Sequence, residues 1–312
     1  MSKQYAFLFP GQGSQFVGMG KFLSDNPIAK SVFQEANAAL GFDLTKLMWE
    51  GPEDELKQTQ NAQPAILTVE VAIGRILQDR GFKPVVMAGH SLGEYSCLVI
   101  SAAMTFADAV RAVNKRGIYM QQAVPLGKGT MAAVLGLDDD SIVEQVCAEI
   151  SAQGFLVEPA NYNCPGQLVI SGSIEGVEKA SVVLKERGAK RCLPLQVSAP
   201  FHCSMLKPAG LNLEKDLNNI RFRNPNMPYI ANVDVASVTR GEDIKGRLVE
   251  QVWSPVRWTQ TMQKLVKTYP NIQLIEVGPG KTIAGLVKKV NDQITTWSTD
   301  TAENLEKVTL TA

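Results

Sequence analysis

The stretch PVVMAGHSLGEYSCLVI (residues 84–100) decides the fold class of this chain. Residues 84–89 form a short apolar run that predicts a buried strand, and residues 91–104 have the length and apolar content of a helix. A turn flanked by glycines joins the two segments. Because a strand that turns sharply into a helix is typical of a parallel sheet covered by helices, we expect an α/β protein.

The turn itself has the G-x-S-x-G pattern, with Gly89, Ser91 and Gly93 at its fixed positions. Between a strand and a helix this pattern predicts a nucleophile elbow, in which the glycines allow a strained turn that exposes the serine hydroxyl. The helix N-terminus then places backbone N–H groups beside developing negative charge. We expect the side chain of His90 to point away from the serine hydroxyl and to brace the turn by hydrogen bonds.

The sequence on either side continues the alternation of strands and helices. The first expected helix begins at Pro27 and ends at Gly41, since proline suits a first helical turn and glycine a helix end. Another expected helix is closed by Gly81. The elements expected here are strand 5–9, helix 27–40, helix 62–80, strand 84–89, helix 91–104 and strand 273–277.

The middle of the chain has a different order of elements. It reads strand 130–136, helix 139–152, strand 155–160, strand 167–172, helix 174–187 and strand 190–197. This βαββαβ order over about 70 residues is the ferredoxin-like pattern. We therefore expect a ferredoxin-like subdomain at residues 127–197, inserted into an α/β-hydrolase-like catalytic subdomain made of residues 1–126 and 198–312 around a central parallel sheet.

A serine nucleophile needs a base, and the chain has only two histidines, His90 and His202. Because His90 directly precedes the serine, elimination leaves His202 as the general base. Cys203 is a weaker rival nucleophile, since nothing nearby in the sequence would activate its thiol. No Asp or Glu can be assigned from the sequence as the acid of a catalytic triad.

Composition excludes several classes of protein. The 312 residues contain 31 basic and 31 acidic side chains, so no broad field attracts nucleic acid or an anionic membrane. The longest apolar runs are shorter than a membrane span, and the N-terminus predicts no secretory signal. Five cysteines without a C-x-x-C pair predict neither a disulfide framework nor a metal site. We expect a cytoplasmic monomer.

Over essentially its whole length, the chain resembles the malonyl-CoA:acyl carrier protein transacylases of fatty-acid synthesis and the acyltransferase domains of polyketide synthases. The resemblance rests on FPGQGSQ (9–15), GHSLGEYS (89–96), RAVNKRG (111–117), NYNCPGQLVISG (161–172), SAPFH (198–202), NVD (232–234), QVWSPVRW (251–258) and EVGPGK (276–281).

The resemblance implies roles for individual residues. Ser91 would be acylated with His202 as its base, and the main-chain carbonyl of Gln251 would orient the histidine in place of a carboxylate. The backbone N–H groups of Gln12 and Leu92 would form the oxyanion hole. A glycine at 11 or 13 would let this loop approach closely.

The resemblance also implies the substrate. Arg116 would bind the free carboxylate of a malonyl group with two hydrogen bonds, and the bulky Phe201 would favour malonyl over methylmalonyl groups. The expected partners are malonyl-CoA and the phosphopantetheine thiol of an acyl carrier protein, with no cofactor. Read without the family, Arg116 is one of several basic residues on a solvated helix face.

Two alternatives stay open. A serine esterase or thioesterase shares the elbow and the oxyanion hole, but such a hydrolase usually has an Asp or Glu hydrogen-bonded to its histidine. The second alternative is a carrier-protein docking module without catalytic activity, which would form no covalent acyl-enzyme.

Overall fold

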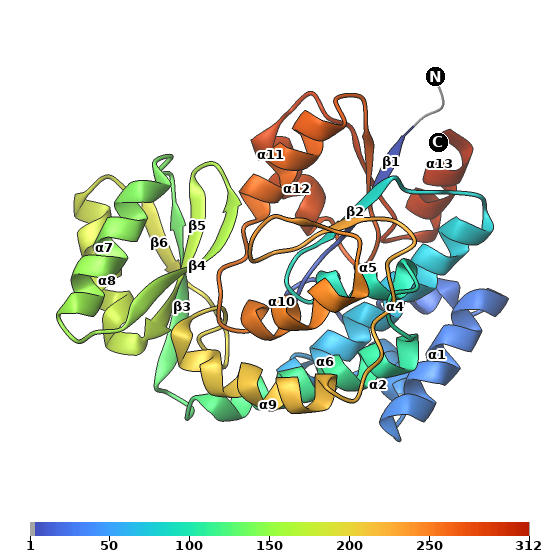
Figure 1. Cartoon of the computed structure of the whole chain (residues 1–312), viewed down its shortest axis with the longest axis horizontal. Coiled ribbons are helices and arrows are strands. Elements are labelled where there is room, and N and C mark those ends of the chain that lie inside the picture. Colours follow the sequence, from blue (N-terminus) through green and yellow to red (C-terminus); the bar gives the residue numbers. More distant parts are fainter. Residues whose placement is uncertain (1–3, 312) are drawn as a thin grey trace.

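The computed structural model describes residues 4–311, in which a six-stranded sheet forms the centre of the larger part of the molecule (Figure 1). Every pairing in this sheet is parallel except that of β7 with β8. The α/β fold class expected from the sequence is confirmed. In spatial order the strands are β10 (Thr296–Ser298), β9 (Gln273–Glu276), β1 (Tyr5–Phe9), β2 (Val86–Gly89), β7 (Tyr229–Ile230) and β8 (Ser237–Val238).

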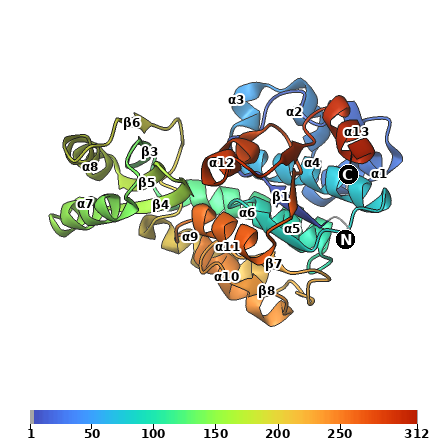
Figure 2. The same cartoon turned by 90° about the horizontal axis from the view of Figure 1, so that it is seen from above.

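Helices cover both faces of this sheet (Figures 1 and 2). Successive side chains of a strand point to opposite faces, so Phe7 and Phe9 of β1 join one hydrophobic cluster while Ala6 and Leu8 join another. The helices of this part are α1 (Pro27–Leu40), α2 (Leu44–Glu50), α3 (Glu53–Leu56), α4 (Thr59–Asp79), α5 (Gly93–Ile100), α6 (Phe106–Ala123), α9 (Lys207–Leu217), α10 (Ile244–Gln251), α11 (Trp258–Thr268), α12 (Thr282–Val290) and α13 (Ala302–Thr311).

A second, antiparallel sheet of four strands lies at one end of the molecule, with two helices on its outer face (Figures 1 and 2). Its order β4-β5-β3-β6 is that of the expected ferredoxin-like pattern, and it has a hydrophobic cluster of its own. Its limits at residues 127 and 197 stay a prediction. Its elements are β3 (Gly129–Leu135), α7 (Asp140–Ala152), β4 (Val157–Cys164), β5 (Gln167–Ser173), α8 (Ile174–Glu186) and β6 (Arg191–Pro194).

Several expected elements are shorter than the sequence suggests, among them strand 84–89, which begins at Val86. Helix 91–104 begins only at Gly93, because Ser91 has a left-handed backbone with φ 51° that a helix cannot include. Strand 190–197 ends at Pro194. In the described residues 4–311, no helix combines the length and apolar character needed to cross a membrane.

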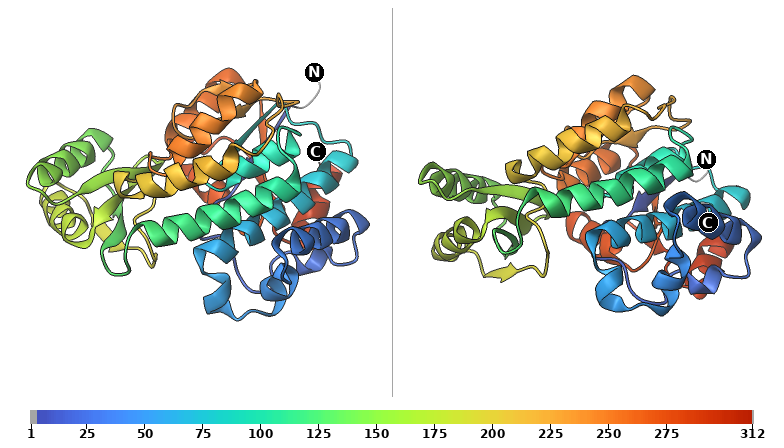
Figure 3. Two further views of the ribbon diagram at one scale, coloured as in Figure 1. Left: turned by 60° about the horizontal axis from the view of Figure 1, so that its bottom comes forward. Right: turned by 90° about the horizontal axis from the view of Figure 1, so that it is seen from below.

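Helices α4 and α6 pack closely beneath the elbow. Pro64 lies inside α4 and cannot donate to the carbonyl of Gln60, which instead accepts a 2.8 Å hydrogen bond from the side chain of Asn114 on α6. Gly117 on α6 has no room for a side chain, since a Cβ atom there would lie 2.6 Å from the Cα of Gln60. Figure 3 shows α6 (green) running beside α9 (gold) toward the antiparallel sheet.

Candidate active site

The turn between β2 and α5 is tightly packed against the neighbouring backbone. A Cβ atom at Gly89 would lie 1.9 Å from the carbonyl carbon of Gly93, and one at Gly93 would lie 2.4 Å from the carbonyl oxygen of Phe9. Only glycine fits at either position. Between them Ser91 has φ 51°, a strained conformation that for residues other than glycine is concentrated at functional sites.

Ser91 and His202 are in direct contact. Ser91 Oγ lies 2.8 Å from His202 Nε2, and His202 itself has φ 59°. On the other side of the ring, Nδ1 lies 2.9 Å from the main-chain oxygen of Gln251 and 3.2 Å from that of Ser254. Two carbonyl acceptors require that Nδ1 carries the proton, which leaves Nε2 free to accept one from the serine. Among residues 4–311, no carboxylate is hydrogen-bonded to His202.

The ring of His202 is neutral at ordinary pH. Burial and the positive charge of Arg116 lower the pKa of His202 to about 3, against the opposing effect of the two carbonyl hydrogen bonds. The imidazole is therefore in the form that can accept a proton.

Arg116 lies on α6 and is not part of a solvated helix face, since only 1% of it is exposed. Its Nη2 donates to Ser91 Oγ at 3.0 Å and to the side-chain oxygen of Gln251 at 2.9 Å, and its Nη1 donates to Gln63 at 2.8 Å. All three partners are neutral, so the cation has no carboxylate in contact with it. The arginine is thus held with its fork beside the serine hydroxyl, where an anionic group could be received.

The glycine-rich loop after β1 packs against the elbow. A Cβ atom at Gly11 would lie 2.7 Å from the main-chain oxygen of His90, so glycine is needed there for close approach. At Gly13 the space is open and the requirement is instead conformational, with φ 103°. In the described part of the chain, the backbone N–H groups of Gln12 and Leu92 donate to no protein acceptor. Leu92 follows the serine and Gln12 lines the same pocket, so these two unpaired donors suit an oxyanion.

A pocket of about 260 Å³ lies at these groups, lined by loops and helices of the larger part and by residues of the antiparallel sheet. Phe201, which precedes the histidine, is 8% exposed and lines the pocket. The antiparallel sheet contributes Met131 of β3 and Asn161 of β4. Phe201 and Met131 therefore give apolar surface to the pocket that also receives Arg116.

His90 points away from the serine, as its position before the nucleophile suggests. Its Nε2 lies 3.0 Å from the side-chain oxygen of Asn163, and its ring rests against Trp258 at 5.6 Å between centroids. Because burial lowers its pKa, the ring is held as a neutral support for the turn.

Cys203 is not prepared to act as a nucleophile. Its thiol is buried and donates to the main-chain oxygen of Pro200, and burial raises its pKa to about 11. All five cysteines are buried and free. Within residues 4–311 there is no group of three His, Cys, Asp or Glu side chains that could hold a metal ion.

Three polar residues at the site had no role assigned from the sequence. Asn232 accepts from the backbone N–H of Ser91 at 2.7 Å and donates to the carbonyl of Gly89 at 2.7 Å, so it clamps both sides of the turn. Buried Glu94 accepts from the side chain of Gln251 at 2.8 Å, and Gln63 accepts from Arg116 as described above. Glu94 lies in the motif GHSLGEYS (89–96) and Asn232 in NVD (232–234), but a motif does not show which residues its members contact.

The chain matches the acyl transferase domain family over residues 6–310. It belongs to the acyl transferase family. The family resemblance expected from the motifs is confirmed.

Named relatives agree with this family. The chain is 48% identical over 307 residues to a malonyl CoA-acyl carrier protein transacylase of Bacillus subtilis (strain 168), covering 98% of this chain and 96% of that protein. It is 49% identical over 294 residues to one from Escherichia coli (strain K12), covering 94% of both.

Solved structures of acyl transferases share the whole fold. The malonyl CoA-acyl carrier protein transacylase of Coxiella burnetii superposes with a TM-score of 0.95 at 42% identity, covering 99% of this chain and 97% of that one. A malonyl-transacylase in complex with its type II PKS acyl-carrier protein superposes with a TM-score of 0.95 at 43% identity, covering 99% and 100%. At this similarity, the two-sheet architecture of the chain is that of the family.

Proposed function

We propose that this acyl transferase moves the malonyl group of malonyl-CoA to the phosphopantetheine thiol of an acyl carrier protein, for fatty-acid or polyketide synthesis. The observation that carries the proposal is the buried guanidinium of Arg116, 3.0 Å from the hydroxyl of Ser91 and without an anionic partner in contact. A hydrolase of neutral esters would have no use for a cation at this place.

The first half of the reaction acylates the enzyme. Ser91 Oγ attacks the thioester carbonyl carbon while its proton passes to His202 Nε2, 2.8 Å away. The oxyanion of the tetrahedral intermediate lies between the N–H groups of Gln12 and Leu92. The carbon–sulfur bond then breaks, CoA leaves with the proton from the histidine, and a malonyl-serine ester remains.

The second half reverses the roles. The phosphopantetheine thiol of the carrier protein gives its proton to His202 and attacks the ester carbonyl. The carbon–oxygen bond to Ser91 breaks, and the serine takes the proton back. Throughout, the carbonyl of Gln251 at 2.9 Å from Nδ1 keeps the ring in the required tautomer.

Selectivity is proposed to come from Arg116 and Phe201. The planar fork of the arginine can bind the malonyl carboxylate with two parallel hydrogen bonds, in exchange for the neutral side chains that it contacts now. Phe201 lines the same pocket, and its ring is the group proposed to disfavour a methyl branch. One methyl group discriminates by only ~1–3 kcal/mol, so exclusion of methylmalonyl is relative.

We also propose that the CoA thioester is the only small molecule required and that no resident cofactor takes part. Five buried, free cysteines support a site of action in the cytoplasm. No structural observation favours the hydrolase, because the described part of the chain has no carboxylate bonded to His202.

A transfer assay tests the proposal. The enzyme is mixed with malonyl-CoA and a carrier protein that bears phosphopantetheine, and the mass of the carrier is followed. We expect malonyl transfer to this carrier and none to the carrier without phosphopantetheine. Release of free malonate without carrier acylation would instead identify a thioesterase.

A further inference from the structure

The side chain of Gln251 connects three parts of the site. Its amide oxygen accepts from Arg116 at 2.9 Å, while its amide nitrogen donates to Glu94 at 2.8 Å and to the main-chain oxygen of Ser91 at 2.9 Å. This orientation of the amide is imposed by its neighbours, because the guanidinium can only donate and an ionised carboxylate can only accept. Turning the amide over would place donor against donor and acceptor against acceptor.

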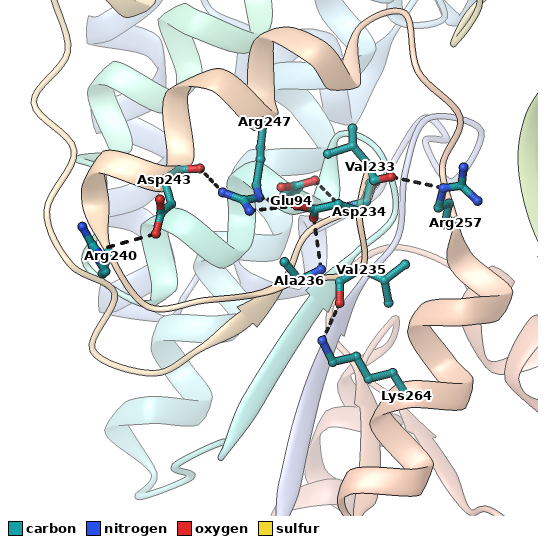
Figure 4. Close-up of polar contacts among 11 residues, drawn as sticks. Glu94, Val233, Asp234, Val235, Ala236, Arg240, Asp243, Arg247, Arg257 and Lys264 are labelled. Atoms are coloured by element: carbon teal, nitrogen blue, oxygen red, sulfur yellow. Dashed lines mark hydrogen bonds and ion pairs between the residues drawn. The ribbon is translucent and has the colours of Figure 1, made fainter.

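Glu94 lies behind this amide in the first turn of α5 and is only 1% exposed. One carboxylate oxygen also accepts from the backbone N–H of Asn232 at 3.2 Å, and the other is buried without a partner in the described residues. Figure 4 shows Glu94 beside the loop that carries Asp234, whose carboxylate pairs with Arg247 of α10. A buried carboxylate with one oxygen unpaired lowers the stability of the fold, which is typical of groups retained for function.

The charged and titratable groups that face Glu94 come from several elements. Arg116 of α6 favours its ionised form, whereas Asp234 opposes it. Tyr229 of β7, together with Tyr95 and Cys97 of α5 itself, is close enough for the charge of Glu94 to act on it. Burial outweighs the favourable contacts and raises the pKa of Glu94 to about 7.

We propose that Glu94 is a positioning residue for substrate choice: through the amide of Gln251 it fixes the fork of Arg116, and as the resident counter-charge it competes with the carboxylate of an incoming malonyl group. This rests on the proposed binding of that carboxylate by Arg116. The two carboxylates share one buried cation, so binding of the substrate favours the protonated form of Glu94. Malonyl groups therefore bind better when Glu94 is neutral, whereas the binding of uncharged acyl groups does not depend on the charge of Glu94.

The test compares acylation of Ser91 by malonyl-CoA and by acetyl-CoA from pH 6 to pH 8.5. Both donors carry the same CoA phosphates, so the ratio of their kcat/KM values cancels the titration of those phosphates. A tenfold change in binding corresponds to about one unit of pKa shift in Glu94 on binding. In the wild type, the malonyl-to-acetyl ratio is expected to fall severalfold, up to about tenfold, as the pH rises.

Two variants separate charge from geometry. Glu94→Gln keeps an acceptor for Gln251 but has no charge, so its ratio should be flat with pH and severalfold above the wild-type ratio at pH 8.5. Glu94→Ala removes one of the partners that hold the amide of Gln251, so the fork of Arg116 is fixed less firmly and the ratio should fall about tenfold at every pH. Glu186→Gln, at an exposed position on α8, is the control for loss of one negative charge.

A Glu94→Gln enzyme that kept the wild-type pH dependence would overturn the proposal, as would an equal loss of malonyl and acetyl transfer in both Glu94 variants. Thermal unfolding of each variant separates such a loss from failure to fold. Failure of the proposed function is a different result, in which the wild type forms no malonyl ester on Ser91 at any pH.

Discussion

Arg116 is the residue at which function conflicts most with stability. Its cation is buried, its Nε has no partner in the described residues, and burial lowers its pKa. Polar contacts with Gln63 and Gln251 satisfy only part of the guanidinium. A buried cation without an ionised partner in contact is costly, and the partner that we propose for it is the malonyl carboxylate.

Replacement of Arg116 by methionine should change the acyl preference. Loss of one partner of a buried ion pair costs about 3–5 kcal/mol, so malonyl transfer should fall a few hundredfold or more. Acetyl transfer should gain in relative terms, because an uncharged group no longer leaves the guanidinium unpaired. Competition between malonyl-CoA, methylmalonyl-CoA and acetyl-CoA for limiting carrier protein measures both effects.

Arg111→Met is the matched control, since Arg111 lies on the same helix but is exposed and paired with Asp108. It should leave the preference as in the wild type. Equal use of acetyl-CoA and malonyl-CoA by the unmodified enzyme would contradict the role of Arg116, and a preference for methylmalonyl-CoA would contradict that of Phe201.

The low pKa of His202 predicts an unusual pH profile. A histidine is lost as a base when pH falls through its folded pKa, and that pKa is lowered to about 3. Acylation of Ser91 at saturating acetyl-CoA should therefore stay level between pH 5 and pH 7. Arg116→Met removes one of the causes that lower this pKa, so the acid limb of its profile should lie at higher pH. A wild-type limb with its midpoint near 6.5 would rule out this environment for the ring.

At the scale of elements, the elbow is held by a segment far away in the sequence. The side chain of Asn232, which follows β7, forms hydrogen bonds with the backbone of both Ser91 and Gly89. These bonds hold the turn in its strained shape but do not contact the acyl group. Asn232 should therefore matter for the rate with every donor, and not for the choice between donors.

Asn232→Ala is expected to lower malonyl and acetyl transfer in equal proportion. It also leaves a buried N–H and a buried carbonyl unpaired, each of which costs about 1–3 kcal/mol in the free energy of unfolding. Urea unfolding and the malonyl-to-acetyl ratio measure the two effects, with Asn271→Ala at an exposed position as the control. A changed ratio would show that Asn232 acts on substrate choice instead.

A buried carboxyl links α4 to α5 behind the elbow. Glu70 is fully buried, its hydrogen-bonding partner is Ser96, and burial raises its pKa well above the ordinary value of 4.5. The folded protein therefore keeps a proton that the unfolded chain releases. The stability of the fold should fall as pH rises from about 4.5 toward the folded pKa of Glu70.

Glu70→Gln tests this link, because the amide cannot ionise. As the pH rises over this window, its free energy of unfolding should increase relative to that of the wild type by up to ~1.4 kcal/mol per pH unit. Urea unfolding between pH 5 and pH 8 gives the difference. A difference that does not change with pH would show that Glu70 does not hold its proton in the fold.

For the molecule as a whole, the sequence predicts the features that follow from local pattern better than the features that depend on contacts between distant residues. The bounds of β1 and α1 agree with the sequence pattern, because Pro27 and Gly41 define the helix and an apolar run defines the strand. The βαββαβ order likewise follows from local periodicity. Ser91 is predicted as the nucleophile because the elbow is a continuous motif that lies between a strand and a helix.

The remaining features depend on residues that meet only after folding. Asn232 is 141 positions from Ser91, and the side chain of Gln251 meets Glu94 from 157 positions away. The sequence suggested a main-chain role for Gln251 through family resemblance, but no local pattern indicates that its amide bridges a cation and a carboxylate. The burial of Arg116 likewise depends on the close packing of α6 against α4, which Gly117 permits.

We propose that malonyl transfer passes through an ester on Ser91. The most direct measurement is the intact mass of the enzyme after mixing with malonyl-CoA, for the wild type and for Ser91→Ala. One malonyl group should be added to the wild type and none to the variant. His202→Ala should lose about as much activity as Ser91→Ala, and the double variant little more, since the two groups act as a unit. An adduct that persists in Ser91→Ala would show that Ser91 is not the acylated nucleophile.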